Sequence, residues 1–241
     1  MSPQIAVLIP CLNEERSIAT VVSDFASALP GAPIYVYDNN STDRSVELAS
    51  KAGAITAFET CQGKGHVVRR MFLDVDADIY VLVDGDNTYD AGAAVRMIEA
   101  LTAEDLDMVV ARRIVEGQDV WRRGHRIGNH FFTHAISLFF GRKLKDVLSG
   151  YRVFSRRFVQ SFAGIAEGFE IEAELTVHAL TRGMRMRELD APYRGRGAGS
   201  ESKLETWTDG FRILRFIARE YYASIGRTTS PATSVNRKSR P

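Results

Sequence analysis

Residues 79–90 read IYVLVDGDNTYD, and this stretch decides the fold class. Its first five residues form a short apolar run, mostly β-branched or aromatic, which is typical of a buried strand in a parallel sheet. Asp84 and Asp86 follow at once. Buried charges are costly without partners, so both carboxylates are expected to face a cleft beyond the strand's carboxyl end. Gly85 lets the backbone turn tightly between them and keeps bulk away from whatever they hold.

Two carboxylates one residue apart offer hard oxygen ligands, which suit Mg²⁺ or Mn²⁺ carrying a substrate phosphate. Asp84 and Asp86 are therefore the predicted metal ligands. The same acids could instead form a polar turn that only ends a strand. On the motif alone, both interpretations stay open.

Strand-like and helix-like patterns alternate on both sides of this stretch. Apolar runs at 5–9, 34–37, 54–58 and 108–111 predict strands, and residues 16–28, 41–52, 63–76 and 91–101 predict helices. Ser41 or Thr42 is the predicted cap of the second helix, and Gly53 the residue that follows its end. The alternation is typical of a parallel, doubly wound α/β sheet. Polar clusters close most of these strands, and we expect them to converge on one edge of the sheet.

The second half of the chain is less regular. The pattern predicts an Arg-rich connection at 112–126, an apolar segment at 127–140, a helix at 169–182, an edge strand at 184–189 and a last helix at 204–222. The apolar segment is expected to be core rather than a lipid site. The last helix is basic and amphipathic, so it could lie on an anionic membrane or pack on its own domain. Residues 226–241 predict a disordered basic tail.

Composition excludes several classes of protein. The 241-residue chain is 45% hydrophobic, which allows a sizeable core, and its net charge of +1 gives no global nucleic-acid-binding signature. No uncharged apolar stretch approaches the roughly 18 residues that span a bilayer. The N-terminus runs directly into a strand rather than a signal peptide. Cys11 and Cys61 match no metal spacing. We therefore expect a cytoplasmic protein, soluble or at most peripheral at the inner face of the membrane.

Four motifs follow one another in the first half: PCLNEE at 10–15, DNNSTD at 38–43, GKG at 63–65 and DGD at 84–86. Together they resemble the family 2 glycosyltransferases. The segments at 146–154, 168–174 and 199–204 are similar to those of the branch that charges polyprenyl phosphates, typified by dolichol-phosphate mannose synthase. The resemblance covers about residues 4–220. It implies the GT-A fold, a Rossmann-like α/β fold of nucleotide-diphospho-sugar transferases in which helices flank a mainly parallel central sheet.

The resemblance also implies a single catalytic domain over residues 1–225, with a nucleotide-binding half at 1–111 and an acceptor-binding half at 112–225. In the first half it implies a nucleoside pocket lined by Pro10, Asn13 and Glu14. Asp38 would bond the base or the ribose, and Lys64 would lie beside the nucleotide; a solvated loop lysine is the alternative for Lys64. Asp84, Gly85 and Asp86 would flank the metal and the donor diphosphate, with Asp86 in a catalytic role.

In the second half, Asp146 lies where inverting members place a catalytic carboxylate. It would act as general base toward a hydroxyl acceptor, or orient other groups if the acceptor is a phosphate, which needs no base. A residue that only caps a turn is the alternative. The acceptor phosphate would be held by residues in the region where members that use lipid phosphates bind anions, namely Arg112, Arg126, Ser202 and Lys203.

Three acids near the start of the helix at 169–182 are spaced by two residues and so cannot share one face. We expect Glu172 to reach the cleft, and Glu170 and Glu174 to be solvated. Two departures from the family pattern also matter. Thr88 stands where members often have a second acidic or amide residue, so a metal would take fewer protein ligands or use Asn87. Asn39 replaces the second acid of a usual pair, so Asp38 would have to make the polar contacts of that pair alone.

The predicted function is a metal-dependent, inverting transfer of a sugar from a UDP- or GDP-sugar to a polyprenyl phosphate at the cytoplasmic membrane face. The absence of the transmembrane helices that many such members carry favours an alternative, a soluble or glycan hydroxyl acceptor in cell-envelope polysaccharide synthesis. A non-catalytic nucleotide-binding module is an alternative from another class. Nucleic acid is not an expected partner, and the sequence does not give the oligomeric state.

Overall fold

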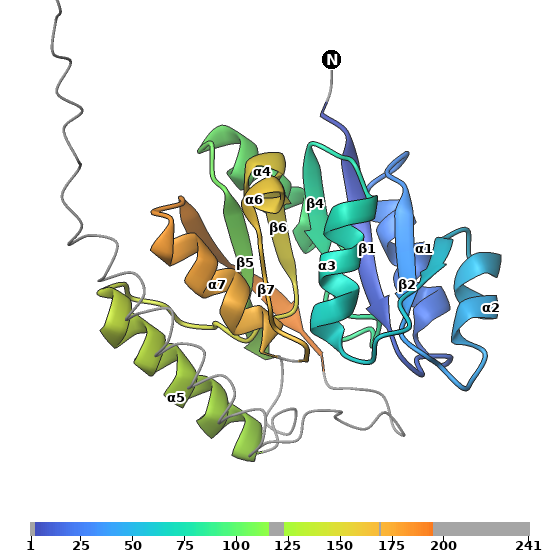
Figure 1. Cartoon of the computed structure of the whole chain (residues 1–241). Coiled ribbons are helices and arrows are strands. Elements are labelled where there is room, and N and C mark those ends of the chain that lie inside the picture. Colours follow the sequence, from blue (N-terminus) through green and yellow to red (C-terminus); the bar gives the residue numbers. More distant parts are fainter. Residues whose placement is uncertain (1–2, 116–122, 169, 195–241) are drawn as a thin grey trace, which may run out of the picture.

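Strands and helices alternate through the first half of the chain, as predicted. The computed structural model describes residues 3–115, 123–168 and 170–194 (Figure 1). The first half holds β1 (Ile5–Cys11), α1 (Ile18–Ala28), β2 (Ile34–Asp38), α2 (Ser45–Lys51), β3 (Ile55–Phe58), α3 (Lys64–Asp74), β4 (Ile79–Leu82), α4 (Ala93–Ala103) and β5 (Met108–Val115). The second holds α5 (Arg123–Phe140), β6 (Arg152–Ser155), α6 (Arg156–Ser161), α7 (Ile171–Thr181) and β7 (Met186–Tyr193).

The seven strands form one sheet in the order β3-β2-β1-β4-β6-β5-β7. Strand β6 runs antiparallel to both of its neighbours, β4 and β5, whereas the other pairs are parallel. The sheet is therefore mainly parallel. The carboxyl ends of β1, β2, β4 and β5 meet the start of β6 at one edge, the lower edge in Figure 1.

Helices cover both faces of the sheet, which is why its central strands are apolar without alternation. Successive residues of a strand point to opposite faces. On β1, Val7 and Ile9 pack with α1 and α4, while Leu8 packs with α3, α6 and α7. A smaller cluster joins α5 to α7 through Phe132 and Ile136. The two large clusters fix the strands, and so fix the edge where their ends meet.

Several predicted boundaries were wrong, each for a local reason. The second helix begins at Ser45 instead of being capped by Ser41 or Thr42, because the Asp43 carboxylate accepts hydrogen bonds from the backbone N–H and the hydroxyl of Ser45. Gly53 does follow the end of that helix, with a φ of 99°. The predicted connection at 112–126 starts too early.

The reason for that last error is the pairing of β5 with β7. These strands pair residue by residue from Met108 with Met186 to Val115 with Tyr193, so the strand continues through the first two arginines of the predicted connection. Strand β7 lies at the sheet edge, as predicted, although it extends to Tyr193.

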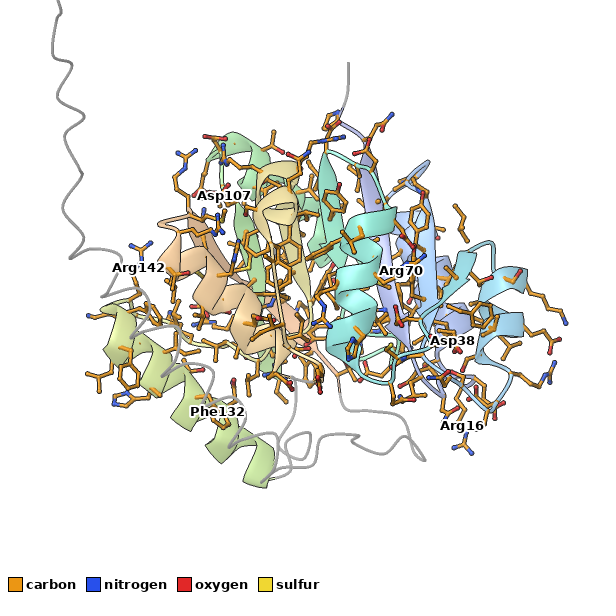
Figure 2. The ribbon with its side chains drawn as sticks, in the orientation of Figure 1. Arg16, Asp38, Arg70, Asp107, Phe132 and Arg142 are labelled. Carbon is orange, nitrogen blue, oxygen red and sulfur yellow. The ribbon has the colours of Figure 1, made fainter. Side chains whose placement is uncertain are left out.

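The apolar segment at 127–140 forms most of α5 and is only partly core. Phe132, labelled on α5 in Figure 2, and Ile136 are buried, but Leu138 is 73% exposed. None of the helices in the part of the chain that the structure describes is long and apolar enough to cross a bilayer. The predicted helix at 204–222 and the tail at 226–241 lie outside the described residues.

Candidate functional site

The loops that follow β1, β2 and β4 are hydrogen bonded to one another at the carboxyl edge of the sheet. The side-chain oxygen of Asn13 accepts from the backbone N–H of Thr42 (2.8 Å), and the Asn13 N–H donates to the Ser41 hydroxyl (2.8 Å). The Ser17 hydroxyl donates to the carbonyl oxygen of Gly85 (2.7 Å). The predicted convergence of the polar clusters at one edge is therefore confirmed.

The residues predicted to line a nucleoside pocket also make contacts within the protein. Pro10 is buried in β1 opposite Tyr37. The Glu14 N–H donates to the Ser45 hydroxyl (2.7 Å), and its carboxylate accepts from Ser17 (3.2 Å). Their contact with a nucleoside stays a prediction.

The two carboxylate oxygens of Asp38 have different surroundings. One carboxylate oxygen accepts a hydrogen bond from the Ser41 N–H (3.0 Å), which closes a polar turn. The other oxygen, Oδ1, is buried without a hydrogen-bond partner among the described residues, and the residue is only 3% exposed. A buried carboxylate oxygen with no donor is costly, so its position favours a ligand that supplies one. Figure 2 shows Asp38 near the lower edge of the sheet, and Asp107 at the opposite edge.

Asn39 carries out a task that the second acid of the usual pair could not. Its amide nitrogen donates to the carbonyl oxygens of Glu59 (2.8 Å) and Cys61 (2.9 Å), and its side-chain oxygen accepts from the Gly63 N–H (2.7 Å). A carboxylate has no donor for the two carbonyls. Asn39 therefore anchors the loop that leads into α3, a role that its sequence neighbours did not indicate.

The two glycines of the GKG motif are required by a close backbone contact. A Cβ atom at Gly63 would overlap the carbonyl oxygen of Glu167, and one at Gly65 would overlap that of Ala166. Gly63 also has a φ of 133°, which side chains rarely adopt. The Gly65 N–H donates to the Glu167 carbonyl (2.9 Å). The segment before α7 thus lies directly on the first turn of α3 and fixes the position of Lys64.

Lys64 is held between two carboxylates rather than solvated. Its ammonium group forms ion pairs with Asp84 from the end of β4 and with Glu172 from the first turn of α7. The Lys64 side chain is 11% exposed and that of Glu172 is 7% exposed. Burial lowers the pKa of Lys64, but the two carboxylates outweigh it and raise that pKa above its ordinary value. Burial raises the pKa of Glu172, against the opposing effect of Lys64.

Glu172 contacts Lys64 at this site, and the prediction that Glu170 and Glu174 are solvated is wrong. Both are buried, at 7% and 4% exposure. The Glu174 carboxylate accepts from the backbone N–H groups of Ile165 (2.8 Å) and Ala166 (2.9 Å), and that of Glu170 from the Glu167 N–H (3.0 Å). The spacing argument failed because α7 is buried on nearly every side and has no solvated face.

Asp84 and Asp86 are each oriented by a close neighbour. A Cβ atom at Gly150 would overlap the Asp84 carboxylate, so the backbone of residue 150 lies directly against it. The Asp86 carboxylate accepts from the hydroxyl (2.6 Å) and the N–H (3.2 Å) of Thr88, which is 1% exposed. Thr88 therefore orients a candidate metal ligand. A Cβ atom at Gly85 would face the core side chains Ile9 and Ile18.

The residues present fit a divalent cation. Asp84 and Asp86 supply hard oxygen donors at the end of one strand, in the pattern that Mg²⁺ and Mn²⁺ accept. Within residues 3–115, 123–168 and 170–194, no group of three His, Cys, Asp or Glu side chains is arranged to hold a metal ion. A cation here would therefore complete its coordination with water and ligand oxygens.

Both carboxylate oxygens of Asp146 accept hydrogen bonds from Arg113. Arg113 Nη2 donates to Oδ1 (2.7 Å), and Arg113 Nε (2.8 Å) and backbone N–H (3.1 Å) donate to Oδ2. The Asp146 side chain is 4% exposed. The Arg113 guanidinium also lies 5.5 Å from the centre of the Tyr193 ring. A chain of contacts links this pair to Asp84: the Tyr193 ring packs against Tyr89, the Tyr89 hydroxyl accepts from the Gly150 N–H (3.1 Å), and the Gly150 backbone lies against Asp84.

Of the predicted acceptor-phosphate residues, Arg112 is the one whose side chain the structure describes. Arg112 forms an ion pair with Asp190 of β7. As neighbours on a strand, Arg112 and Arg113 point to opposite faces, and Arg113 is the one that reaches Asp146. The side chain of Arg126 and all of Ser202 and Lys203 lie outside what the structure describes.

Arg152 supports the site from below, and its role was missed from the sequence. It is fully buried and donates to the carbonyl oxygens of Val147 (2.7 Å), Ser149 (2.9 Å) and Glu172 (2.8 Å). Burial lowers its pKa to about 10. One guanidinium thus ties the segment before β6 to the start of α7. An arginine among small and apolar residues on a short strand was the available signal.

Comparison with known proteins gives a consistent set of relatives. The family model described as "Glycosyl transferase family 2" matches residues 6–162. Protein RfbJ of Shigella flexneri is 55% identical over 123 residues, 51% of this chain and 95% of RfbJ. Glycosyltransferase AglJ of Haloferax volcanii is 33% identical over 232 residues, 92% of this chain and 76% of AglJ. A dolichyl-phosphate hexose transferase of the same organism is 29% identical over 215 residues, 89% of this chain and 92% of that protein.

The fold itself has a solved counterpart. Glucosyl-3-phosphoglycerate synthase from Mycobacterium tuberculosis, crystallised with Mn²⁺, UDP-glucose and phosphoglyceric acid, superposes with a TM-score of 0.75. It is 21% identical, and the match covers 92% of this chain and 80% of that one. The likeness is one of fold.

Proposed function

Because this chain belongs to glycosyl transferase family 2 and is a glycosyltransferase with the GT-A fold, we propose that it moves a sugar from a UDP- or GDP-sugar to a polyprenyl phosphate. The proposed transfer is metal-dependent and inverts the anomeric centre. The acceptor class is supported by the likeness to a dolichyl-phosphate hexose transferase over 89% of this chain.

On the donor side, Asp84 and Asp86 would hold Mg²⁺ or Mn²⁺. When bound, the cation would neutralise the negative charge that grows on the leaving diphosphate. Oδ1 of Asp38, which has no hydrogen-bond partner among the described residues, would accept a hydrogen bond from the base or ribose. Lys64 would add a fixed positive charge next to the diphosphate.

On the acceptor side, the observation that carries the proposal is the bidentate ion pair between Asp146 and Arg113. A general base needs a carboxylate oxygen that can reach the acceptor proton. Both oxygens of Asp146 are instead occupied by one guanidinium, so the carboxylate orients a cation. A phosphate acceptor is already an anion, needs no base and is attracted by a fixed cation. The pairing therefore favours a phosphate over a hydroxyl acceptor.

A donor screen tests the proposal. Purified protein is incubated with UDP- and GDP-sugars and Mn²⁺, with and without a short-chain polyprenyl phosphate, and the released nucleotide is measured. We expect release that rises only with the lipid phosphate. Asp86→Ala should abolish it, while Asp24→Ala, at an exposed acid on α1, should leave it unchanged. Release that ignores the lipid would overturn the acceptor, and failure to bind any nucleotide would overturn the donor.

A further inference from the structure

We propose that Lys64 occupies the place of the divalent cation on Asp84 in the metal-free enzyme, and that Glu172 retains Lys64 when the metal enters. The inference rests on the metal use proposed above. It makes Glu172 a positioning residue, because it would act through Lys64 rather than touch the substrate.

The contacts of Lys64 carry the inference. Its one ammonium group donates to Asp84 Oδ1 and to Glu172 Oε1, so it already has two alternative carboxylates within reach. Both ion pairs are largely screened from water, with exposures of 11% for Lys64, 23% for Asp84 and 7% for Glu172. Buried carboxylates need a cation. In this structure, Lys64 supplies it.

The charges require that this arrangement changes when a metal binds. A divalent ion on Asp84 would stand beside the Lys64 ammonium, and two neighbouring cations repel strongly in a partly buried site. Lys64 must then give up Asp84. Because Glu172 contacts the ammonium from the α7 side, Lys64 can remain paired after it leaves Asp84.

The surrounding backbone keeps both partners in place during such an exchange. Lys64 starts from a turn that the Glu167 and Ala166 carbonyls press against through Gly63 and Gly65. The Glu172 carbonyl is held by the buried Arg152 (2.8 Å). Only the flexible lysine side chain has to move, which makes the exchange a local event.

The test is a titration of nucleotide-free protein with Mn²⁺. Binding is measured from the electron paramagnetic resonance signal of the Mn²⁺ that stays free in solution. Four proteins are compared: wild type, Lys64→Met, Glu172→Gln and the double variant. Without Lys64, Asp84 loses its competing cation, so we expect Mn²⁺ to bind at least about tenfold more tightly. In Glu172→Gln, the negative charge that competes with Asp84 for Lys64 is lost, so Mn²⁺ should bind more weakly. The double variant should match Lys64→Met.

This equality separates the proposal from simple charge effects. If the two substitutions add, so that the double variant binds Mn²⁺ more weakly than Lys64→Met, Glu172 acts as a ligand or as a distant charge and the proposal is overturned. It is also overturned if removing Lys64 does not tighten binding. Should Lys64→Met fail to fold, Glu172→Gln and the double variant still differ only at Lys64 and must show the gain.

Lys51→Met provides the matched control, because it removes one positive charge from an exposed lysine on α2. Its Mn²⁺ affinity should equal that of wild type. A wild-type protein that binds no Mn²⁺, even with UDP or GDP present, would contradict the proposed metal use itself. Mn²⁺ binding that is indifferent to Lys64 would contradict only the exchange.

Discussion

The backbone of Gly150 lies directly against the carboxylate of Asp84, so that no side chain at position 150 fits beside it. The contact is held from the other side by Tyr89, whose hydroxyl accepts the Gly150 N–H (3.1 Å). Glycine at this position therefore sets where a candidate metal ligand stands.

Gly150→Ala should displace the Asp84 carboxylate and reduce sugar transfer. Because a misplacement of about 1 Å at a reacting centre can cost roughly 100-fold, we expect a loss of about that size in kcat/KM. The variant should still fold, since the added methyl group meets a side chain rather than backbone. Transfer rates and thermal unfolding measure the two effects. Unchanged activity would show that Asp84 can move without consequence.

Gly31→Ala is the control for that substitution. Gly31 has a φ of 84° and open space around it. An alanine there should cost about 1 kcal/mol of stability through backbone strain, with activity retained.

Asp38→Asn should weaken nucleotide binding without destabilising the fold. The amide oxygen of asparagine can still accept from the Ser41 N–H (3.0 Å). The substitution places an NH2 group, which cannot accept, where the oxygen without a donor among the described residues stands. Hydrogen bonds to charged groups contribute about 1.5–3 kcal/mol, so affinity for the preferred nucleotide should fall roughly 10- to 100-fold. Calorimetric titration with UDP and GDP measures this. An unchanged affinity would leave Asp38 as a turn residue only.

Asp146→Asn should cost both stability and activity, because it leaves the buried Arg113 charge without its carboxylate. Breaking such a pair typically costs about 3–5 kcal/mol. Replacing both partners, as Asp146→Asn with Arg113→Met, should restore much of the free energy of unfolding but not the transfer rate. Urea unfolding and kinetic assays on the single and double variants distinguish the two properties. Activity that recovers together with stability would make the pair purely structural.

His178 should make the fold less stable in mild acid. Burial, with a contribution from Arg182, lowers its pKa from 6.5 to about 4, and its ring packs against Phe158 and Phe162. Between these values the unfolded chain binds more protons than the folded protein, so the unfolding free energy falls as pH drops from 6.5 toward 4. Urea midpoints at pH 5 and 7.5 should differ less in His178→Gln than in wild type. Equal differences would contradict the assignment.

The first half of the fold could be predicted because its signals are local. Each strand there is an apolar run that ends in polar residues, and the convergence of Asp38, Asp84 and Asp86 follows from parallel order alone. The GT-A fold and the family were predicted from the same motifs, each of which is a short stretch of consecutive residues.

The parts that could not be predicted depend on partners far along the chain. Strand β6 has four residues, and nothing in them says that it enters between β4 and β5 in the opposite direction. The burial of Glu170 and Glu174 requires knowledge that the segment at 164–168 turns back over the start of α7. The choice of Arg113 rather than Arg112 at the site depends on where β5 ends, and that end is set by β7.

The distance along the chain between Lys64 and its partner Glu172, 108 residues, has a consequence for how the protein is made. At typical rates of synthesis, roughly 5–20 s pass between the two residues leaving the ribosome. Strands β1 to β4 emerge first, but the carbonyls that pack on the GKG turn follow only with residues 166 and 167. A product that terminates before residue 166 would therefore lack both these carbonyls and Glu172, so we expect incomplete translation to yield no partly active enzyme.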